Sequence, residues 1–122
     1  MAGRLSYIKE TNVALADEKC IPCRVGGKPL PAEEARELAR WVPDWKLTEK
    51  QIERELKFKD FREAMAFVNK VADVAEEQGH HPDILISYNR VRITLWTHKV
   101  GGLSRADFVL GAKIDRLLSA KC

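Results

Sequence analysis

The sequence predicts an α+β domain in which a four-stranded antiparallel sheet carries three helices packed on one face. Two segments alternate like β-hairpins with one apolar face each, and three segments have apolar residues at helical spacing. Their order is helix, two strands, helix, two strands, helix. The 122-residue chain is 45% hydrophobic, which suffices for one domain with a buried core. The open face and edges of such a sheet need cover, so we expect a homodimer or homotetramer.

An irregular amino-terminal extension over residues 1–29 is expected to precede the folded domain of residues 30–122, because residues 1–29 show no firm periodicity. The chain has three cysteines, too few for a disulfide scaffold: Cys20, Cys23 and Cys122. Cys20 and Cys23 have the spacing of half a zinc knuckle or of a redox pair, but no second cysteine pair follows. We interpret them as two cysteines of the extension, and a site shared with the histidines or with another subunit is the weaker alternative.

The first helix is expected from about Leu30 to Arg40. Pro31 suits the first turn of a helix, and Glu33 and Glu34 suit its positive end. The apolar stripe of this helix consists of Ala32, Ala35, Leu38 and Ala39.

The first hairpin is expected to join Trp45–Leu47 to Ile52–Phe58. Its apolar face consists of Ile52, Leu56 and Phe58. Arg54 interrupts the alternation on that face, where a half-buried strand normally carries an apolar side chain.

The longest helix has the clearest pattern in the sequence. Asp60 and Glu63 have the spacing of a capping box at its start, and Gly79 suits a left-handed cap at its end. The apolar residues between them recur at intervals of three and four: Phe61, Ala64, Met65, Val68, Val71, Ala72 and Ala75.

The second hairpin is expected to join Ile84–Tyr88 to Val91–Leu95 through a loop at Asn89-Arg90. That loop gives three apolar cross-strand pairs: Tyr88 with Val91, Ile86 with Ile93, and Ile84 with Leu95. The other face then carries Leu85, Ser87, Arg92, Thr94 and Trp96. After this hairpin we expect a turn at Gly101-Gly102 and a last helix that begins with Ser104 and Asp107. The inner stripe of the last helix consists of Leu110, Ile114, Leu117 and Leu118.

Charge and hydropathy exclude some classes of function. The 21 basic and 18 acidic residues give a net charge of +3 and are interspersed, so no direct nucleic-acid partner is indicated. No apolar run approaches the roughly 18 residues of a membrane span, and the amino end has no hydrophobic signal region. We therefore expect a cytoplasmic protein with no membrane association.

All three histidines of the chain fall around the second hairpin: His80, His81 and His98. Continuing the expected register places His81 opposite His98, with Cβ atoms roughly 5 Å apart, whereas a three-residue loop would place His80 there. Three carboxylates lie nearby in the sequence and can fix an imidazole tautomer: Glu76, Asp83 and Asp107. Histidine is the side chain best suited to proton transfer near neutral pH. The pattern therefore favours acid–base catalysis.

Other interpretations of the same residues stay open. A single histidine at a strand end is usually a surface residue, Asp107 fits a helix cap after Ser104, and Trp96 can serve either sheet packing or as a platform for a flat ring. Three histidines can also bind zinc. Adjacent residues in an extended chain point in different directions, however, so His80 and His81 suit one metal ion poorly, and we expect no metal site.

The pattern resembles that of the pterin-4a-carbinolamine dehydratase family. The matching residues are Glu76-x-x-x-His80-His81-Pro82 followed by Tyr88, His98 and Asp107, together with Thr97, Gly101-Gly102-Leu103-Ser104 and Lys57-Phe58-Lys59-Asp60-Phe61. The resemblance covers about residues 31–118 and implies the same four-stranded fold.

The resemblance also implies a function, namely dehydration of a 4a-hydroxytetrahydropterin to the quinonoid dihydropterin, a step in recycling the cofactor of aromatic amino acid hydroxylases. It implies a pterin substrate and no metal or organic cofactor. By position, the catalytic residues are His80, His81 and His98, and the substrate-binding residues are Glu76, Pro82, Thr97 and Asp107. The second hypothesis is a non-catalytic binding module on the same fold, either a transcriptional dimerisation cofactor or an assembly helper. A zinc protein is third.

Overall fold

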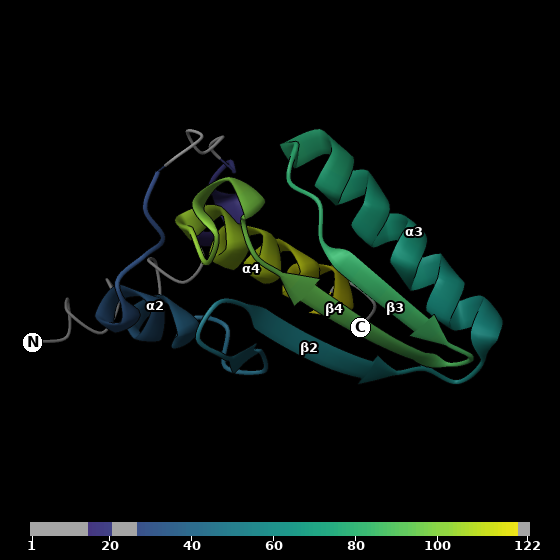
Figure 1. Ribbon diagram of the computed structural model, residues 1–122. Helices are drawn as coiled ribbons and strands as arrows, with labels where there is room; N and C mark the ends of the chain where they lie inside the picture. Colours follow the sequence, from purple (N-terminus) through teal and green to yellow (C-terminus); the bar gives the residue numbers. More distant parts are fainter. Residues whose placement is uncertain (1–14, 21–26, 120–122) are drawn as a thin grey trace, which may run out of the picture.

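The computed structural model describes residues 15–20 and 27–119 and has the predicted α+β architecture (Figure 1). The described residues include the helices α2 (Ala32–Ala39), α3 (Phe61–Gln78) and α4 (Arg105–Ser119), each longer than one turn. The strands are β1 (Lys46–Leu47), β2 (Ile52–Lys57), β3 (Asp83–Ser87) and β4 (Arg90–Leu95), and a short 3-10 helix, η1, spans His98–Val100. The strands form one antiparallel sheet in the order β1-β2-β4-β3.

The hairpin β3–β4 forms as predicted, but its register differs from the expected one by two residues. Ile84 pairs with Ile93 and Ile86 pairs with Val91, so the predicted pairs are wrong. The turn is centred on Tyr88 and Asn89, with Tyr88 at φ 54°. Asn89 is held in that turn because its amide donates to the Phe58 carbonyl at 2.8 Å while Phe58 N–H donates to the Asn89 carbonyl at 2.8 Å. A shift of two residues leaves each side chain on its predicted face.

Helix α3 has the predicted caps. The Asp60 side chain accepts from the Glu63 N–H at 2.8 Å, and Gly79 ends the helix at φ 65° in the left-handed region. The predicted apolar stripe is partly wrong, because Phe61 is 50% exposed and Ala72 is exposed, whereas Phe67 is buried. Phe61 is the first residue of α3, whereas Phe67 packs against Phe58 with ring centroids 5.2 Å apart.

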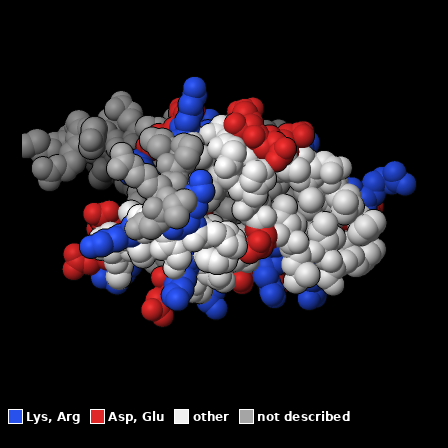
Figure 2. Space-filling view, turned by 45° about the horizontal axis from the view of Figure 1, so that its top comes forward, with Lys and Arg blue, Asp and Glu red and all other residues white. Residues whose placement is uncertain are grey.

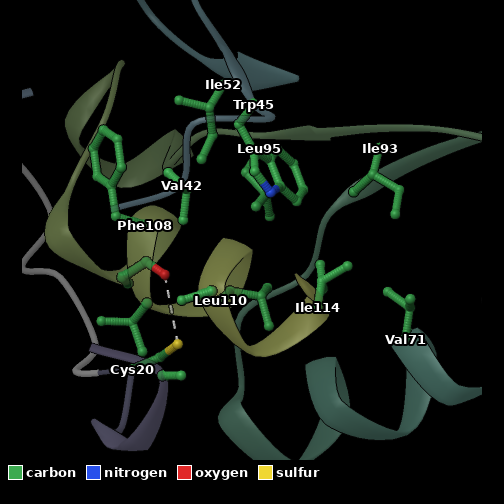
Figure 3. Packing of buried hydrophobic residues seen from close by; sticks show 14 of the residues in the cluster. Cys20, Val42, Trp45, Ile52, Val71, Ile93, Leu95, Phe108, Leu110 and Ile114 are labelled. Carbon is green, nitrogen blue, oxygen red and sulfur yellow. Dashed lines mark hydrogen bonds between the residues drawn. The ribbon is translucent and has the colours of Figure 1, made fainter. Parts of the chain in front are cut away.

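Helix α4 is the centre of the core. Its predicted residues Leu110 and Ile114 are fully buried, but Leu117 and Leu118 are only half-buried. Residues 106–112 are buried all around the helix, including the unpredicted Phe108. Figure 3 shows these side chains packed between the sheet residues on one side and Cys20 on the other. A helix that is buried on every side needs a partner beyond the sheet, and the described residues 15–20 supply it.

The predicted amino-terminal extension lies mostly outside the described residues. Its described part includes a helical turn at residues 15–17, and Leu15 is 1% exposed. Cys23 and Cys122 lie outside the described residues, so their predicted roles stay predictions. Helix α2 is present as predicted and contacts α4. Of its predicted stripe only Ala35 is fully buried, and Ala32 is exposed.

The interruption at Arg54 has a structural explanation. Arg54 pairs with Ile93 and faces the core, where its guanidinium lies 2.5 Å from Asp115 Oδ1 on α4. Trp45 Nε1–H donates to the same oxygen at 2.8 Å. Burial raises the pKa of the Asp115 carboxyl, and its hydrogen bonds to Trp45 and Arg54 act in the opposite direction. An arginine on the apolar face therefore fastens strand β2 to helix α4.

The surface carries both signs of charge. In Figure 2, Lys and Arg are spread around the visible face with Asp and Glu among them, rather than gathered in one patch. Among the described residues, no helix is both long enough and apolar enough to cross a membrane. The helix-free face of the sheet carries the predicted outward side chains, and Leu85 on that face is 55% exposed.

Candidate active site

The three histidines line one cavity of about 350 Å³ at the end of the sheet where α3 stops and β3 starts. His80 and His81 come from the segment between α3 and β3, and His98 begins η1 after β4. Pro82 and Thr97 also line this cavity. Asp83 and Trp96 line it as well, so the structure brings together seven of the residues that the sequence singled out, in a volume typical of small-molecule sites.

The route by which the histidines meet differs from the predicted one. The β3–β4 ladder ends at the pair Asp83–Thr94, so His81 and His98 are not cross-strand partners. Beyond the ladder, Thr97 bridges to Gly102, and Gly101 turns the chain at φ 68°. The histidines converge because the segment between α3 and β3 and the segment after β4 lie at the same end of the sheet.

His80 is positioned from both its backbone and its ring. Its N–H donates to the Ala75 carbonyl at 3.2 Å across the Gly79 cap, which fixes where the chain leaves α3. Its Nε2 lies 2.6 Å from Asp107 Oδ1, and the His80 side chain is only 15% exposed. His80 is therefore an imidazole held in one orientation by a carboxylate.

Asp107 is fully buried and has a second set of partners. Its Oδ2 accepts from the Ser104 N–H at 2.9 Å and from the Thr97 hydroxyl at 2.9 Å. The Thr97 and Ser104 hydroxyls lie 2.7 Å apart. The helix cap expected for Asp107 and its place beside a histidine thus coexist, because the carboxylate uses one oxygen for each.

His81 has a different environment. Its Nε2 lies 2.5 Å from Glu76 Oε2, and both side chains are largely exposed. Glu76 stands on the last turn of α3, and the two residues lie five positions apart. Glu76 and Asp107 do not line the cavity themselves but hold two of the histidines that do.

Trp96 and His98 form an aromatic wall. Their ring centroids lie 3.7 Å apart at an interplanar angle of 37°. Trp96 Nε1–H donates to Asp83 Oδ2 at 3.2 Å, so Asp83 orients the indole rather than an imidazole. Trp96 lies one residue beyond the end of β4 and lines the cavity, where an indole can pack against a flat ligand.

Three residues of the cavity wall were not anticipated: Gln78, Lys99 and Ala106. Cys20 also lines the cavity, so of the two interpretations of this cysteine the structure favours the weaker one, a position shared with the histidines. Lys99 follows His98 directly in the chain, so the prediction of His98 as a site residue could also have indicated Lys99. Cys20 lies 86 positions before Ala106, and no sequence pattern connects them. Within residues 15–20 and 27–119, no group of three or more His, Cys, Asp or Glu side chains is arranged to hold a metal ion.

Chemically, the arrangement combines one half-buried imidazole on a buried carboxylate with two exposed imidazoles around an open cavity. Such a set can accept a proton at one position and donate one at another, and the Trp96 indole offers a flat face nearby. The observed geometry suits acid–base chemistry on a planar ligand.

Comparison with known proteins supports a specific family. The family model described as pterin 4 alpha carbinolamine dehydratase matches residues 28–117. A relative in Rubrobacter xylanophilus, provisionally named a pterin-4-alpha-carbinolamine dehydratase, is 49% identical over 104 residues, covering 84% of this chain and 97% of that protein. A relative of the same provisional name in Alkaliphilus metalliredigens is 47% identical over 104 residues, covering 84% and 94%.

A solved structure is similar over the same region. The transcriptional coactivator/pterin dehydratase of Brucella melitensis is 34% identical with a TM-score of 0.70, covering 74% of this chain and 98% of that one. The family model spans the whole sheet, α2, α3, all but the last two residues of α4, and the three histidines of the cavity. The chain belongs to the pterin 4 alpha carbinolamine dehydratase family.

Proposed function

We propose that the protein dehydrates a 4a-hydroxytetrahydropterin to the quinonoid dihydropterin by histidine acid–base catalysis. The observation that carries this proposal is the gathering of His80, His81 and His98 around one cavity beside the flat face of Trp96. Membership of the dehydratase family supports it independently.

The reaction removes one water from the substrate. A proton leaves the ring nitrogen next to the hydroxyl-bearing carbon, the carbon–oxygen bond breaks, and a proton joins the departing hydroxyl. The nitrogen–carbon double bond of the quinonoid product takes up the electron pair. One base and one acid are therefore required, and two imidazoles in opposite protonation states supply both.

His80 is the proposed principal acid–base residue. An ionised Asp107 can only accept, so His80 Nε2 donates to it, and Nδ1 is the nitrogen left for the substrate. A carboxylate that fixes the tautomer also stabilises the imidazolium formed when Nδ1 takes a proton. His98 is the proposed partner that exchanges the second proton, and His81, held by Glu76, orients the pterin.

The substrate-binding roles follow from position. The Thr97 hydroxyl donates a hydrogen bond to Asp107, which in turn holds His80. Pro82 contributes an apolar part of the cavity wall. Glu76 acts through His81. The reaction needs no metal or organic cofactor in this scheme, since every proton moves between imidazole and substrate.

The direct test is the rate at which purified protein accelerates decay of a 4a-hydroxytetrahydropterin, in the wild type and in His80→Ala. We expect acceleration by the wild type and loss of most of it in the variant. Full activity in His80→Ala would defeat the assignment of His80, and absence of acceleration by the wild type would defeat the function.

A binding module is the second candidate, because the similar Brucella melitensis protein is described as both coactivator and dehydratase. Leu85 and Tyr88 are exposed apolar side chains away from the histidines, as a contact surface for another protein or a second copy requires. A pull-down with a variant lacking all three histidines separates the two functions, because a scaffold should keep its partners without them. The homodimer or homotetramer stays a prediction that sedimentation of the purified protein can test.

A further inference from the structure

The described residues 15–20, here called the strap, form part of the wall of the histidine cavity. Cys20, at the end of the strap, lines the cavity beside Gln78 of α3 and Ala106 of α4. These residues belong to three separate segments, and only Cys20 comes from the strap, so its share of the wall exists only when the strap is in place.

The strap is bound to the domain at its cavity end. The Cys20 N–H donates to Gln78 Oε1 at 2.9 Å, and the Cys20 thiol donates to the Ala106 carbonyl with a separation of 3.6 Å. Figure 3 shows the thiol directed at that carbonyl from below α4. Both contacts reach residues that line the same cavity.

The rest of the strap is fastened along α4. Lys113 Nζ donates to the Ala16 carbonyl at 2.8 Å, and Arg105 forms a two-bond ion pair with Glu18 at 2.8 and 2.7 Å. Leu15 is 1% exposed within the core. Contacts at both ends and along its length hold the strap as a fixed part of the domain.

The chemical character of this wall suits a flat, polar ring. Burial raises the pKa of the Cys20 thiol to about 11, so the thiol is neutral near pH 7. A neutral sulfur is small and polarizable and packs well against the face of an aromatic ring. It therefore adds contact area to the cavity without adding charge.

Gln78 connects the strap to the catalytic segment. It is the last residue of α3, followed directly by the Gly79 cap and His80. Its Oε1 is the acceptor for Cys20, 58 positions away. The hydrogen bond thus joins the strap to the segment that presents His80.

We propose that the strap is part of the pterin-binding pocket, with Cys20 as a wall residue and Gln78 as the positioning residue that holds it there. The inference rests on the proposed dehydratase function and adds the residues that determine affinity for the ring. The strap affects binding of the substrate, whereas His80 and His98 carry the proton transfers.

The first test compares Gln78→Met with Gln78→Glu. Met has similar length but no acceptor for the Cys20 N–H, whereas Glu keeps one. For loss of one hydrogen bond we expect Gln78→Met to raise KM about three- to tenfold with kcat little changed. Gln78→Glu loses the bond from Gln78 Nε2 to Glu77 Oε1 and adds a charge to the wall, but it keeps the acceptor for the Cys20 N–H, so its KM is expected to rise less than that of Gln78→Met. A Gln78→Met variant with a lowered Tm but an unchanged KM shows a purely structural role and overturns the proposal.

The second test needs no turnover. Alkylation of Cys20 by iodoacetamide is followed by peptide mass spectrometry in the full chain, with and without 7,8-dihydropterin, while tryptophan fluorescence reports whether the dihydropterin binds. We expect bound dihydropterin to slow the alkylation of Cys20. Binding without any change in the alkylation rate overturns the role of the strap and leaves the proposed function standing. No dihydropterin binding to the wild type overturns both.

Discussion

His80 Nε2 and Asp107 Oδ1 lie 2.6 Å apart, although 27 positions separate the two residues in the chain. The contact joins the residue that follows the α3 cap to the first turn of α4, so the packing of these helices sets the orientation of the imidazole. Asp107 also caps α4, so the same carboxylate stabilises the fold and orients the His80 imidazole.

Replacing His80 by Gln should lower kcat by about 10²- to 10⁴-fold, the usual contribution of a positioned acid–base side chain. Initial rates of 4a-hydroxytetrahydropterin dehydration, with Tm as a check on folding, measure the effect. His81→Gln serves as the matched comparison and should raise KM more than it lowers kcat, because His81 is proposed to orient the substrate. If instead His81→Gln lowered kcat more and His80→Gln raised KM more, the roles proposed for the two histidines would be exchanged.

Asp107→Asn should lower both stability and kcat. An amide cannot accept from His80 on one side and from Ser104 and Thr97 on the other, so a buried polar group is left unsatisfied at a cost of about 1–3 kcal/mol. The control is Ser104→Ala, which loses the hydroxyl contact with Thr97 but keeps the backbone N–H that donates to Asp107.

Ser104→Ala should therefore lose only about 1 kcal/mol of stability and keep kcat near that of the wild type. Denaturant unfolding and steady-state kinetics on both variants separate the two contributions. If Ser104→Ala reduced kcat as strongly as Asp107→Asn, the effect of Asp107 would be that of a cap alone.

Arg54→Met should destabilise the fold by about 2–4 kcal/mol, since it leaves Asp115 without the guanidinium in a largely buried site. Burial already raises the pKa of the Asp115 carboxyl above its ordinary value of 3.8, and loss of Arg54 should raise it further. A raised pKa in the folded state means that stability is lost as the pH rises through that pKa.

The Tm deficit of Arg54→Met should consequently be smaller at pH 4 than at pH 7. The double variant Arg54→Met/Asp115→Leu is the control, because it removes both charges and should recover much of the loss. An equal Tm deficit at pH 4 and pH 7 would mean that the destabilisation does not come from the Asp115 carboxylate.

Glu18→Gln should cost about 0.2–1 kcal/mol at pH 7, because the Glu18–Arg105 pair is partly exposed to solvent. The hydrogen bond from Arg105 holds the pKa of the Glu18 carboxyl below its ordinary value of 4.5. The stabilisation is therefore complete above that value and is lost as the pH falls through the lowered pKa. Thermal unfolding of both proteins from pH 7 to pH 3 should show the difference in Tm shrinking at the acidic end. A Tm difference that stays constant from pH 7 to pH 3 would mean that the ion pair is not its source.

The order of helices and strands, the caps of α3 and the faces of the hairpin follow from the sequence, because they depend on residues a few positions apart. Asp60 and Gly79 are recognisable as caps from their immediate neighbours, and a strand's alternation survives the two-residue shift in register. The clustering of three histidines around one hairpin could also be predicted from the sequence, since each lies near a strand end in the same part of the chain.

Only the tertiary structure decided which carboxylate meets which imidazole and what completes the cavity wall. Asp107 reaches His80 because α4 packs beside the end of α3, and Cys20 reaches Gln78 because the strap runs along α4. Sequence periodicity indicates which side of an element is buried but not against what. Contacts between distant segments depend on how whole elements pack, and that packing is fixed by the shape of the shared core rather than by any local pattern.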